Sequence, residues 1–326
     1  MSKKTKRYTI GVDIGGTKVL TALLDEQFKV VTSLKSKVKL SKGRSYFLDT
    51  IVDHCRGVIE QGQVSPKKIA AVGVGCPGMI EFPKGIVCLS PNIAFLKNYA
   101  LQEKLKKRLK IPVFVENDVN AGLYGEYRLG SAKGYKHVFG IFLGTGVGGA
   151  MILDGKLFRG VTGGAGEVGH IFLSAGFLNG KNTLEEMVGR HAIASEAALL
   201  LLKNKAKNLQ RLVDDDVQKI KSGVLAEAVR EGDRAVRELI LSKAEILGIA
   251  MANVVNLLNP ELIVLGGGVM EALGQVILPE AVRSMKKHAL KPLVKSVHVV
   301  PARLKDLSVA TGAAKLAHEW VNGEFE

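Results

Sequence analysis

Short apolar runs typical of β-strands alternate along this chain with longer segments whose apolar residues recur at helical spacing. Residues 8–14, 19–25 and 29–35 are rich in Val, Ile, Leu and Thr and predict strands. Residues 45–61 carry apolar positions at helical spacing and predict a helix. This alternation predicts an α/β protein.

The same alternation continues through the rest of the chain. Residues 68–78 form an apolar strand that ends in a glycine turn, and residues 111–118 form one that ends in polar side chains. Residues 119–130 predict the helix that follows. Residues 184–202 and 224–259 are long and rich in Ala and Leu, so we expect each to be helical.

An internal repeat is the most informative feature of this organisation. Residues 11–15 (GVDIG) and 140–144 (GIFLG) share one pattern, and each is followed at the same spacing by a strand that ends in Leu-Asp. The apolar run at residues 69–78 is likewise echoed at residues 262–270, where it also leads into glycine. Because the first offset is constant, the two segments predict related β-hairpins. The repeat predicts two similar lobes with a ligand cleft between them.

The length of 326 residues and the hydrophobic content of 47% agree with two lobes, since such a chain can bury a substantial core. The order of the motifs places the hinge near residues 118–121. We therefore expect a small lobe formed by residues 1–118 with a C-terminal helix at 309–326, and a large lobe formed by residues 119–308.

Composition narrows the cellular setting and the partners. No apolar stretch is long enough to span a membrane, and the basic start of the chain leads into a glycine-rich segment rather than a signal peptide. Three scattered cysteines suit a reducing cytoplasm. The net charge of +15 comes largely from short basic runs without interleaved aromatic residues, which predicts a solvated surface rather than a nucleic-acid site. We expect a cytoplasmic protein without nucleic-acid or membrane partners.

The DIGGTK segment at residues 13–18 combines the groups that bind a phosphate. Gly15 and Gly16 let backbone N–H groups approach a ligand closely, Thr17 adds a hydroxyl, and Lys18 follows. The Asp13 carboxylate can hold Mg²⁺ directly or through water. Taken alone, the segment is equally consistent with a plain hairpin turn.

Two further glycine-rich loops strengthen the phosphate-binding interpretation. Gly144, Thr145 and Gly146 form the same device in the second copy of the repeat. Gly267 and Gly268 follow another apolar strand and could approach a nucleoside, although a simple strand-to-helix turn explains them as well. Two such loops at equivalent places of a repeat indicate a phosphate-transfer site that excludes water.

Polar residues at two other places are candidates for chemistry. Asp118 lies where a buried strand meets a helix, which suits either a proton acceptor in phosphoryl transfer or a helix N-cap. Glu167 and His170 stand three residues apart in a glycine-dense segment, so that both can face one sugar.

In their order along the chain, these motifs resemble the ROK family of sugar kinases and repressors, within the actin and hexokinase-like ATPase superfamily. The matching segments are DIGGTK, CPGMI, SPN, ENDVNAGLYGE, LGTGVGGA, GAGEVGH, TLEEM, LGGGV and TGAAKLA. The resemblance implies two lobes of the actin, hexokinase and ribonuclease H-like type, each with a mixed β-sheet and flanking helices. It also implies a homodimer.

The resemblance assigns roles to individual residues. It implies that Asp118 is the general base and that the sugar pocket is formed by Asn117, Glu167, His170, Glu185, Asn92 and Gly78. The loops at 13–18 and 144–146 would bind the phosphates of ATP with Mg²⁺ at Asp13, and Gly267 and Gly268 would lie on the adenosine side. The implied reaction is phosphorylation of a hexose, glucose first, at its 6-hydroxyl.

One segment departs from the family pattern. Many members carry a cysteine cluster for zinc after the Glu-x-Gly-His motif, whereas residues 171–186 contain no cysteine. We therefore expect no structural zinc and predict that Phe172, Phe177 and Leu178 hold this loop by packing.

Other functions are compatible with the same motifs. A sugar-responsive regulator of this family would carry a DNA-binding module before the first phosphate loop, and we expect none because twelve residues precede Asp13. Polyphosphate could replace ATP as donor, and a sugar-binding protein without catalysis is a further alternative.

Overall fold

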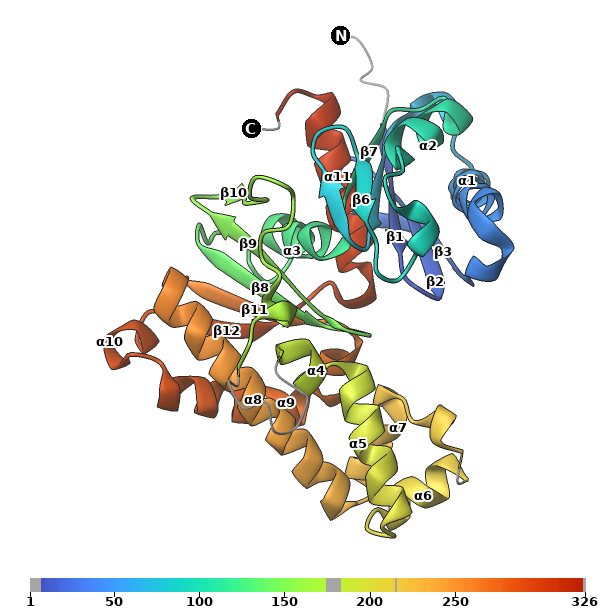
Figure 1. Ribbon diagram of the computed structural model, residues 1–326. Coiled ribbons are helices and arrows are strands. Elements are labelled where there is room, and N and C mark those ends of the chain that lie inside the picture. Colours follow the sequence, from blue (N-terminus) through green and yellow to red (C-terminus); the bar gives the residue numbers. More distant parts are fainter. Residues whose placement is uncertain (1–6, 174–182, 215, 325–326) are drawn as a thin grey trace. The chain divides into compact units, whose positions relative to one another are not determined.

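The computed structural model describes residues 7–173, 183–214 and 216–324 (Figure 1). The chain forms two compact units. The first comprises Met1–Gly134, Met151–Ala165 and Asp306–Glu326, and the second comprises Tyr135–Ala150 and Gly166–Lys305. These boundaries differ from those expected at residues 118 and 309, since the segment up to Gly134 belongs to the first unit.

The first sheet is mixed and has the strand order β3-β2-β1-β4-β7. Strands β1, β2 and β3 are antiparallel neighbours, whereas β1, β4 and β7 run parallel. Its strands are β1 (Tyr8–Ile14), β2 (Lys18–Leu24), β3 (Val30–Lys37), β4 (Ile69–Cys76) and β7 (Val113–Asn117). A separate antiparallel pair consists of β5 (Met79–Glu81) and β6 (Ile86–Leu89). The apolar runs of the sequence thus predicted all five strands of the first sheet.

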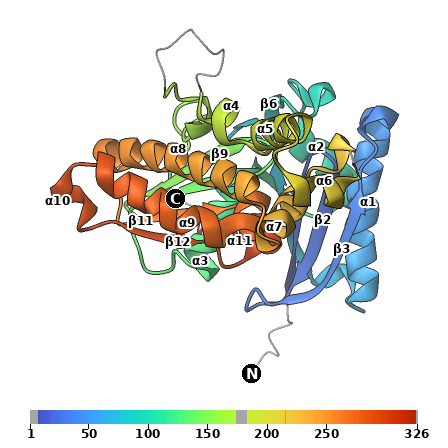
Figure 2. The same cartoon turned by 90° about the horizontal axis from the view of Figure 1, so that it is seen from below.

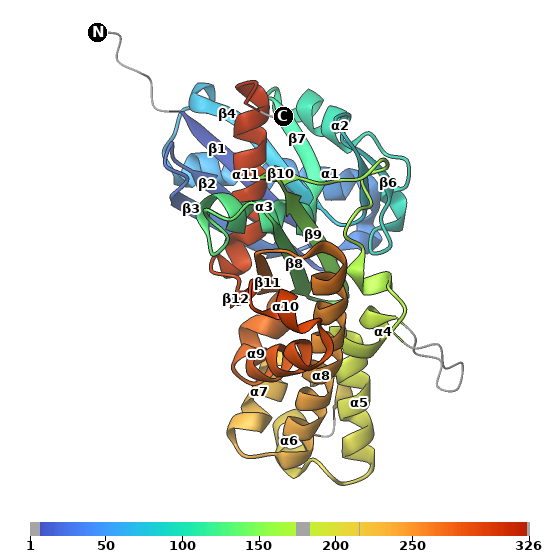
Figure 3. The ribbon, with the colours of Figure 1, turned by 90° about the vertical axis from the view of Figure 1, so that its left-hand side faces the viewer.

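Helices cover both faces of the first sheet (Figures 1 and 3). They are α1 (Gly43–Gln61), α2 (Leu101–Leu109), α3 (Asp118–Leu129) and α11 (Ser308–Val321). Helices α1 and α2 pack on the main core cluster, while α11 packs on the opposite face. Glycines in the sheet permit this approach, because a Cβ atom at Gly11 would lie 1.8 Å from the carbonyl oxygen of Ala310.

Close packing between α3 and α11 explains why α3 belongs to the first unit. A Cβ atom at Gly312 of α11 would lie 1.8 Å from the carbonyl oxygen of Ala121 in α3. A Cβ atom at Gly125 would similarly lie 2.5 Å from the carbonyl oxygen of Ser308. The motif order could not reveal this packing, since the two helices are far apart in sequence.

The second sheet repeats the strand arrangement of the first, with the order β10-β9-β8-β11-β12. Its strands are β8 (Val138–Leu143), β9 (Val147–Leu153), β10 (Lys156–Leu157), β11 (Leu262–Gly266) and β12 (His298–Pro301). The boundary between the units falls within β9, after Ala150. Strands β8 and β11 run parallel, as β1 and β4 do. Both predicted echoes therefore occupy equivalent places in their sheets.

Seven helices are described for the second unit: α4 (Leu184–Val188), α5 (Arg190–Leu202), α6 (Lys207–Val213), α7 (Ser222–Arg230), α8 (Arg234–Leu258), α9 (Gly268–His288) and α10 (Lys291–Val294). Helices α8 and α9 lie side by side (Figures 1 and 2).

Both long helical segments predicted from the sequence are interrupted. Gly189 divides α4 from α5, and Gly232, with φ of +86°, divides α7 from α8. Asp233 then caps α8 by accepting a hydrogen bond from the backbone N–H of Val236. Across the described residues, every helix is too short or too polar to cross a bilayer.

Candidate active site

Two predicted acids of the first unit lie at the carboxyl ends of β1 and β7, two parallel strands that flank β4. Asp13 of β1 pairs in register with Gly75 of β4, and Gly75 pairs in turn with Glu116 of β7. Asp118 follows β7 as the first residue of α3. A Cβ atom at Gly75 would lie 3.4 Å from the Cα atom of Asp118, so this glycine lets α3 begin close to β4. The parallel strands thereby bring Asp13 and Asp118 to one edge of the sheet.

Negative charge concentrates around Asp13. Burial, together with the charges of Asp118 and Asp306, raises the pKa of Asp13 from 3.8 to about 7, and the charge of Lys35 opposes this shift. Lys35 itself forms an ion pair with Asp306, with 2.5 Å between its Nζ and Oδ2. Sequence reasoning did not identify Asp306, which stands alone in a polar segment and carries no motif. The raised pKa means that burial and the two neighbouring carboxylates disfavour the charged form of Asp13.

A Mg²⁺ ion fits this arrangement of hard oxygen donors. The described residues contain no group of three or more His, Cys, Asp or Glu side chains arranged to hold a metal ion. Mg²⁺ is usually bound by one or two carboxylates with waters and substrate phosphates completing its shell. Asp13 would therefore hold Mg²⁺ as one member of a shell that water and phosphate complete.

The helix N-cap is Asn117 rather than Asp118. The Oδ1 atom of Asn117 accepts a hydrogen bond of 2.9 Å from the backbone N–H of Asn120. Its Nδ2 donates to the carbonyl oxygen of Gly78 at 3.0 Å, in a turn where Gly78 has φ of +109°. Asp118 instead accepts from the adjacent N–H of Val119 at 3.0 Å. Since Asn117 fills the capping role, the cap explanation for Asp118 is wrong.

A buried ion pair stabilises the junction between β7 and α3. Glu116 is 3% exposed, and its Oε2 accepts from Nε of Arg159 at 2.7 Å. Its Oε1 accepts from the N–H of Asn117 at 3.0 Å and from Nδ2 of Asn120 at 3.2 Å. The guanidinium of Arg159 also lies over the ring of Phe82, 4.5 Å from its centroid. No signal in the sequence connects Glu116 with Arg159.

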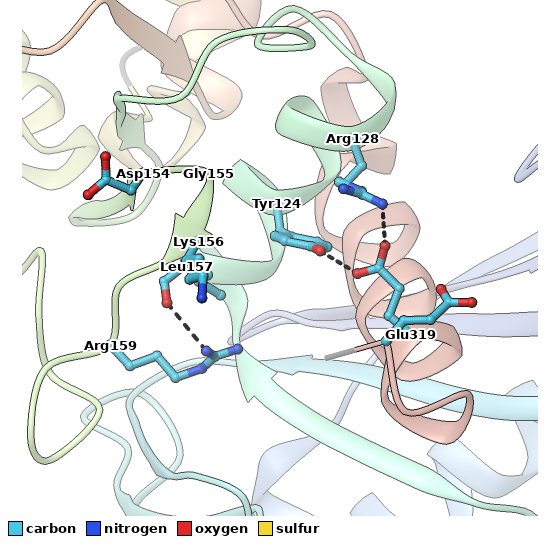
Figure 4. A pocket seen from close by; sticks show the side chains of 9 residues that line it. Tyr124, Arg128, Asp154, Gly155, Lys156, Leu157, Arg159 and Glu319 are labelled. Carbon is cyan, nitrogen blue, oxygen red and sulfur yellow. Dashed lines mark hydrogen bonds and ion pairs between the residues drawn. The ribbon is translucent and has the colours of Figure 1, made fainter. Parts of the chain in front are cut away.

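A second polar network ties α3 to α11 beside a cavity of about 240 Å³ (Figure 4). Glu319 of α11 accepts a hydrogen bond from the hydroxyl of Tyr124, and its Oε1 lies 2.6 Å from Nη2 of Arg128. Burial and the bond to Glu319 raise the pKa of Tyr124. Because these charged groups pair with one another, the network stabilises the helix that begins at Asp118.

The first predicted phosphate loop is the exposed turn between β1 and β2. The N–H of Gly15 donates to the carbonyl oxygen of Lys18 at 2.8 Å, which closes the turn. Thr17 and Lys18 are exposed. Asn92 lies next to this turn, since a Cβ atom at Gly16 would be 3.8 Å from that of Asn92. Asn92 thus borders the loop within the first unit.

In the second unit, Glu185 contacts the second glycine loop. The N–H of Gly144 donates to the carbonyl oxygen of Gly146 at 2.9 Å, and the N–H of Val147 donates to Oε2 of Glu185 at 2.8 Å. A Cβ atom at Gly146 would lie 2.0 Å from the same oxygen, so a larger residue would displace the Glu185 carboxylate from this position. The resemblance gave Glu185 a role towards sugar only and did not predict this contact with the loop.

Glu167 and His170 lie together at a short 3-10 helix, Val168–His170. The Nε2 of His170 is 3.9 Å from Oε2 of Glu167, and both side chains are accessible, at 66% and 45% exposure. Partial burial and the charge of Glu185 raise the pKa of Glu167, while His170 opposes the shift. The structure therefore brings together the three residues predicted for sugar in this unit.

The expected packing of the cysteine-free loop is wrong for Phe172, which is 74% exposed. Phe177 and Leu178 lie outside the described residues. Backbone pairing holds the described ends of the segment, since Phe172 bridges Thr183 and the N–H of Leu184 donates to Ile171 at 3.1 Å. With this backbone pairing, the side chain of Phe172 lies in solvent.

The third glycine turn lies beside a cavity of about 590 Å³ and packs against the residue before the second loop. Gly267 has φ of +88°, and a Cβ atom there would lie 2.4 Å from the carbonyl oxygen of Leu143, the residue before Gly144. The cavity is lined by α7, the end of β11 and α9, including Val229, Leu265, Gly266, Met270, Leu273 and Ala302. Its size and largely apolar walls suit a purine nucleoside.

The duplicated mixed sheets, with glycine turns at equivalent strand ends, define a protein of the actin and hexokinase-like fold. The chain belongs to the ROK family, whose model matches residues 9–320.

Two relatives and one solved structure illustrate the similarity. A glucokinase of Streptomyces coelicolor is 32% identical over 95% of this chain and 98% of its own length. A xylose repressor of Caldicellulosiruptor bescii is 29% identical over 93% of this chain and 76% of its own. A ROK family glucokinase of Streptomyces griseus, solved with glucose and AMPPNP, has a TM-score of 0.82 and 30% identity over 96% of this chain and 99% of its own. The family thus includes both kinases and repressors.

Proposed function

We propose that this chain is a cytoplasmic sugar kinase that transfers the terminal phosphate of ATP to the 6-hydroxyl of a hexose, with glucose as the first candidate. The observation that carries the proposal is the position of Asp118. Its neighbour Asn117 caps α3, and Asp118 lies at the same strand edge as Asp13. A carboxylate so placed can accept a proton while a second acid keeps a cation nearby.

In this mechanism Asp118 accepts the proton of the sugar hydroxyl as the hydroxyl attacks the phosphate. A carboxylate of ordinary basicity suffices, because phosphoryl transfer depends mainly on positioning and late proton acceptance. Mg²⁺ at Asp13 would supply charge neutralisation for the phosphates. The Glu116–Arg159 pair keeps Asn117 and Asp118 in place through the hydrogen bonds described above.

We assign the remaining groups according to the contacts in each unit. The backbone and hydroxyl groups of the turns at 15–18 and 144–146 bind phosphates, and the cavity beside Gly267 accepts the adenosine. Asn117, Glu167, His170 and Glu185 bind sugar hydroxyls, with Asn92 and Gly78 shaping the first unit's contribution. The similarity to glucokinases supports both assignments.

The Asp118→Asn variant tests the proposal. General-base catalysis contributes about 10²- to 10⁴-fold, so kcat for ADP release with glucose and Mg-ATP should fall by about that factor. The affinity for glucose should change less than about threefold, as measured by calorimetry. A wild-type protein that phosphorylates none of glucose, fructose, mannose, allose and N-acetylated amino sugars would overturn the proposal, as would an unimpaired variant.

A sugar-responsive regulator is the second candidate, favoured by the similarity to a xylose repressor. Both candidates bind sugar, so sugar binding cannot separate them. Sequence-specific DNA binding that is released by a sugar, in a protein without hexose-dependent ADP release, would support the regulator. Omitting nucleotide and adding polyphosphate in the same assay tests the alternative donor, and light scattering tests the proposed homodimer.

A further inference from the structure

The corner between α4 and α5 holds the second glycine loop at both of its ends. The backbone N–H of Arg190 donates to the carbonyl oxygen of Gly144 at 3.3 Å. The Nη2 of Arg190 donates to Oγ1 of Thr145 at 2.8 Å. Beyond the tip, Glu185 accepts from the N–H of Val147 at 2.8 Å. One short stretch of chain thus contacts the loop through main-chain and side-chain groups.

The charge of Arg190 is directed to the loop rather than to an acid. Within the described parts of the chain, its guanidinium bonds to the hydroxyl of Thr145 and forms no ion pair. A guanidinium has five N–H donors and no acceptor, and one of them donates to Thr145 at 2.8 Å. Arg190 is half-buried, and Thr145 at the loop tip is exposed. The bond from the backbone N–H of Arg190 to the carbonyl oxygen of Gly144 holds the main chain of Arg190 beside the loop.

The geometry points to Arg190 as a positioning residue that orients the Thr145 hydroxyl towards a phosphate of the nucleotide. This inference rests on the proposed function, because it assumes that the loop binds phosphate. Since a guanidinium can only donate, the Thr145 oxygen must act as an acceptor towards Arg190. Its single O–H proton is then directed elsewhere, and it becomes a stronger donor because the oxygen is polarised by a cation.

A purely structural clamp would predict something different. If Arg190 only stabilised the loop and the adjoining turn, its removal would disturb every ligand of the nucleotide site, including adenosine. If it acts through Thr145 on a phosphate, its removal should weaken only ligands that carry phosphates. Adenosine and AMPPNP therefore separate the two roles.

The experiment measures binding of AMPPNP with Mg²⁺, and of adenosine, by calorimetry. A charged hydrogen bond contributes enough that Arg190→Met should weaken AMPPNP binding by about 10- to 100-fold. Adenosine binding should change less than twofold. Arg190→Lys keeps a cationic donor and should lose less than Arg190→Met does. Arg237→Met, which removes the same charge from an exposed position of α8, should leave both affinities unchanged.

A double-mutant cycle with Thr145→Val shows whether Arg190 acts through the hydroxyl. Thr145→Val alone should weaken AMPPNP binding, and adding Arg190→Met should cost less than a further twofold. Additive losses, unchanged AMPPNP affinity in Arg190→Met, or an equal loss for adenosine would each overturn the inference. A wild-type protein that binds no AMPPNP would instead overturn the proposed function itself.

Discussion

Replacing Arg159 by Met should destabilise the first unit substantially. The change removes the guanidinium from the buried Glu116 carboxylate. The carboxylate then keeps only the neutral donors of Asn117 and Asn120 among the partners described above. Removing one partner of a buried ion pair costs about 3 to 5 kcal/mol. Loss of the cation–π contact with Phe82 adds to that cost. Because the two neutral donors remain, we expect about 3 kcal/mol.

Urea denaturation followed by fluorescence measures this loss. The single tryptophan, Trp320, belongs to α11 and packs against Phe114 of β7, with 5.8 Å between ring centroids, so it reports on the first unit. With an m-value of about 2 to 3 kcal/mol/M, the midpoint for Arg159→Met should fall by about 1 M.

Two control variants make the result specific. Adding Glu116→Gln to Arg159→Met removes the buried charge, so the double variant should recover part of the lost stability. Arg108→Met breaks an exposed pair with Asp49 in the same unit and should cost less than about 1 kcal/mol. A loss of less than 1 kcal/mol in Arg159→Met would refute the reasoning. So would a double variant that loses more stability than Arg159→Met and Glu116→Gln lose together.

The pKa of Asp13 and the packing of α11 lead to two further predictions. Because the pKa of Asp13 is raised to about 7 from 3.8, the folded chain binds an extra proton between these values and loses stability as the pH rises through that window. In Mg²⁺-free buffer, the free energy of unfolding of Asp13→Asn should therefore exceed that of wild type by about 1 to 3 kcal/mol at pH 8 and equal it near pH 4. A variant that is less stable than wild type at pH 8 would contradict the cause given. Gly312→Ala should cost about 1 to 3 kcal/mol or more, since its methyl group meets the carbonyl oxygen of Ala121, whereas Gly223→Ala, with open space around it, should change the urea midpoint little.

The repeat reveals an asymmetry with chemical meaning. Asp13 of β1 is in register with Gly75, and Phe142 of β8 is in the equivalent register with Gly266. The same backbone device thus occurs twice, but only the first copy carries an acid. At this register position the first unit therefore has an ionisable side chain and the second an apolar one.

Local features of the sequence determined the strands of the first sheet, several helices, the repeat and the glycine turns. Apolar runs and turn residues act over a few positions, so β1, β4 and the loops at 15–18 and 144–146 could be predicted without a structure. The two long helices were predicted without their breaks, because Gly189 and Gly232 each stand inside otherwise helical patterns.

Only the tertiary structure decided which polar groups meet. Asp306 near Asp13, Arg159 on Glu116 and the corner of α4 and α5 on the glycine loop all join residues that are distant in sequence. Such contacts depend on how helices pack on a sheet, which no spacing of residues encodes. The cap of α3 differs from these contacts because the residues concerned are close in sequence. Asn117 and Asp118 are neighbours, and both residue types can cap a helix. There, the carbonyl oxygen of Gly78, which accepts from Nδ2 of Asn117, and the backbone geometry at the end of β7 determined that Asn117 and not Asp118 caps the helix.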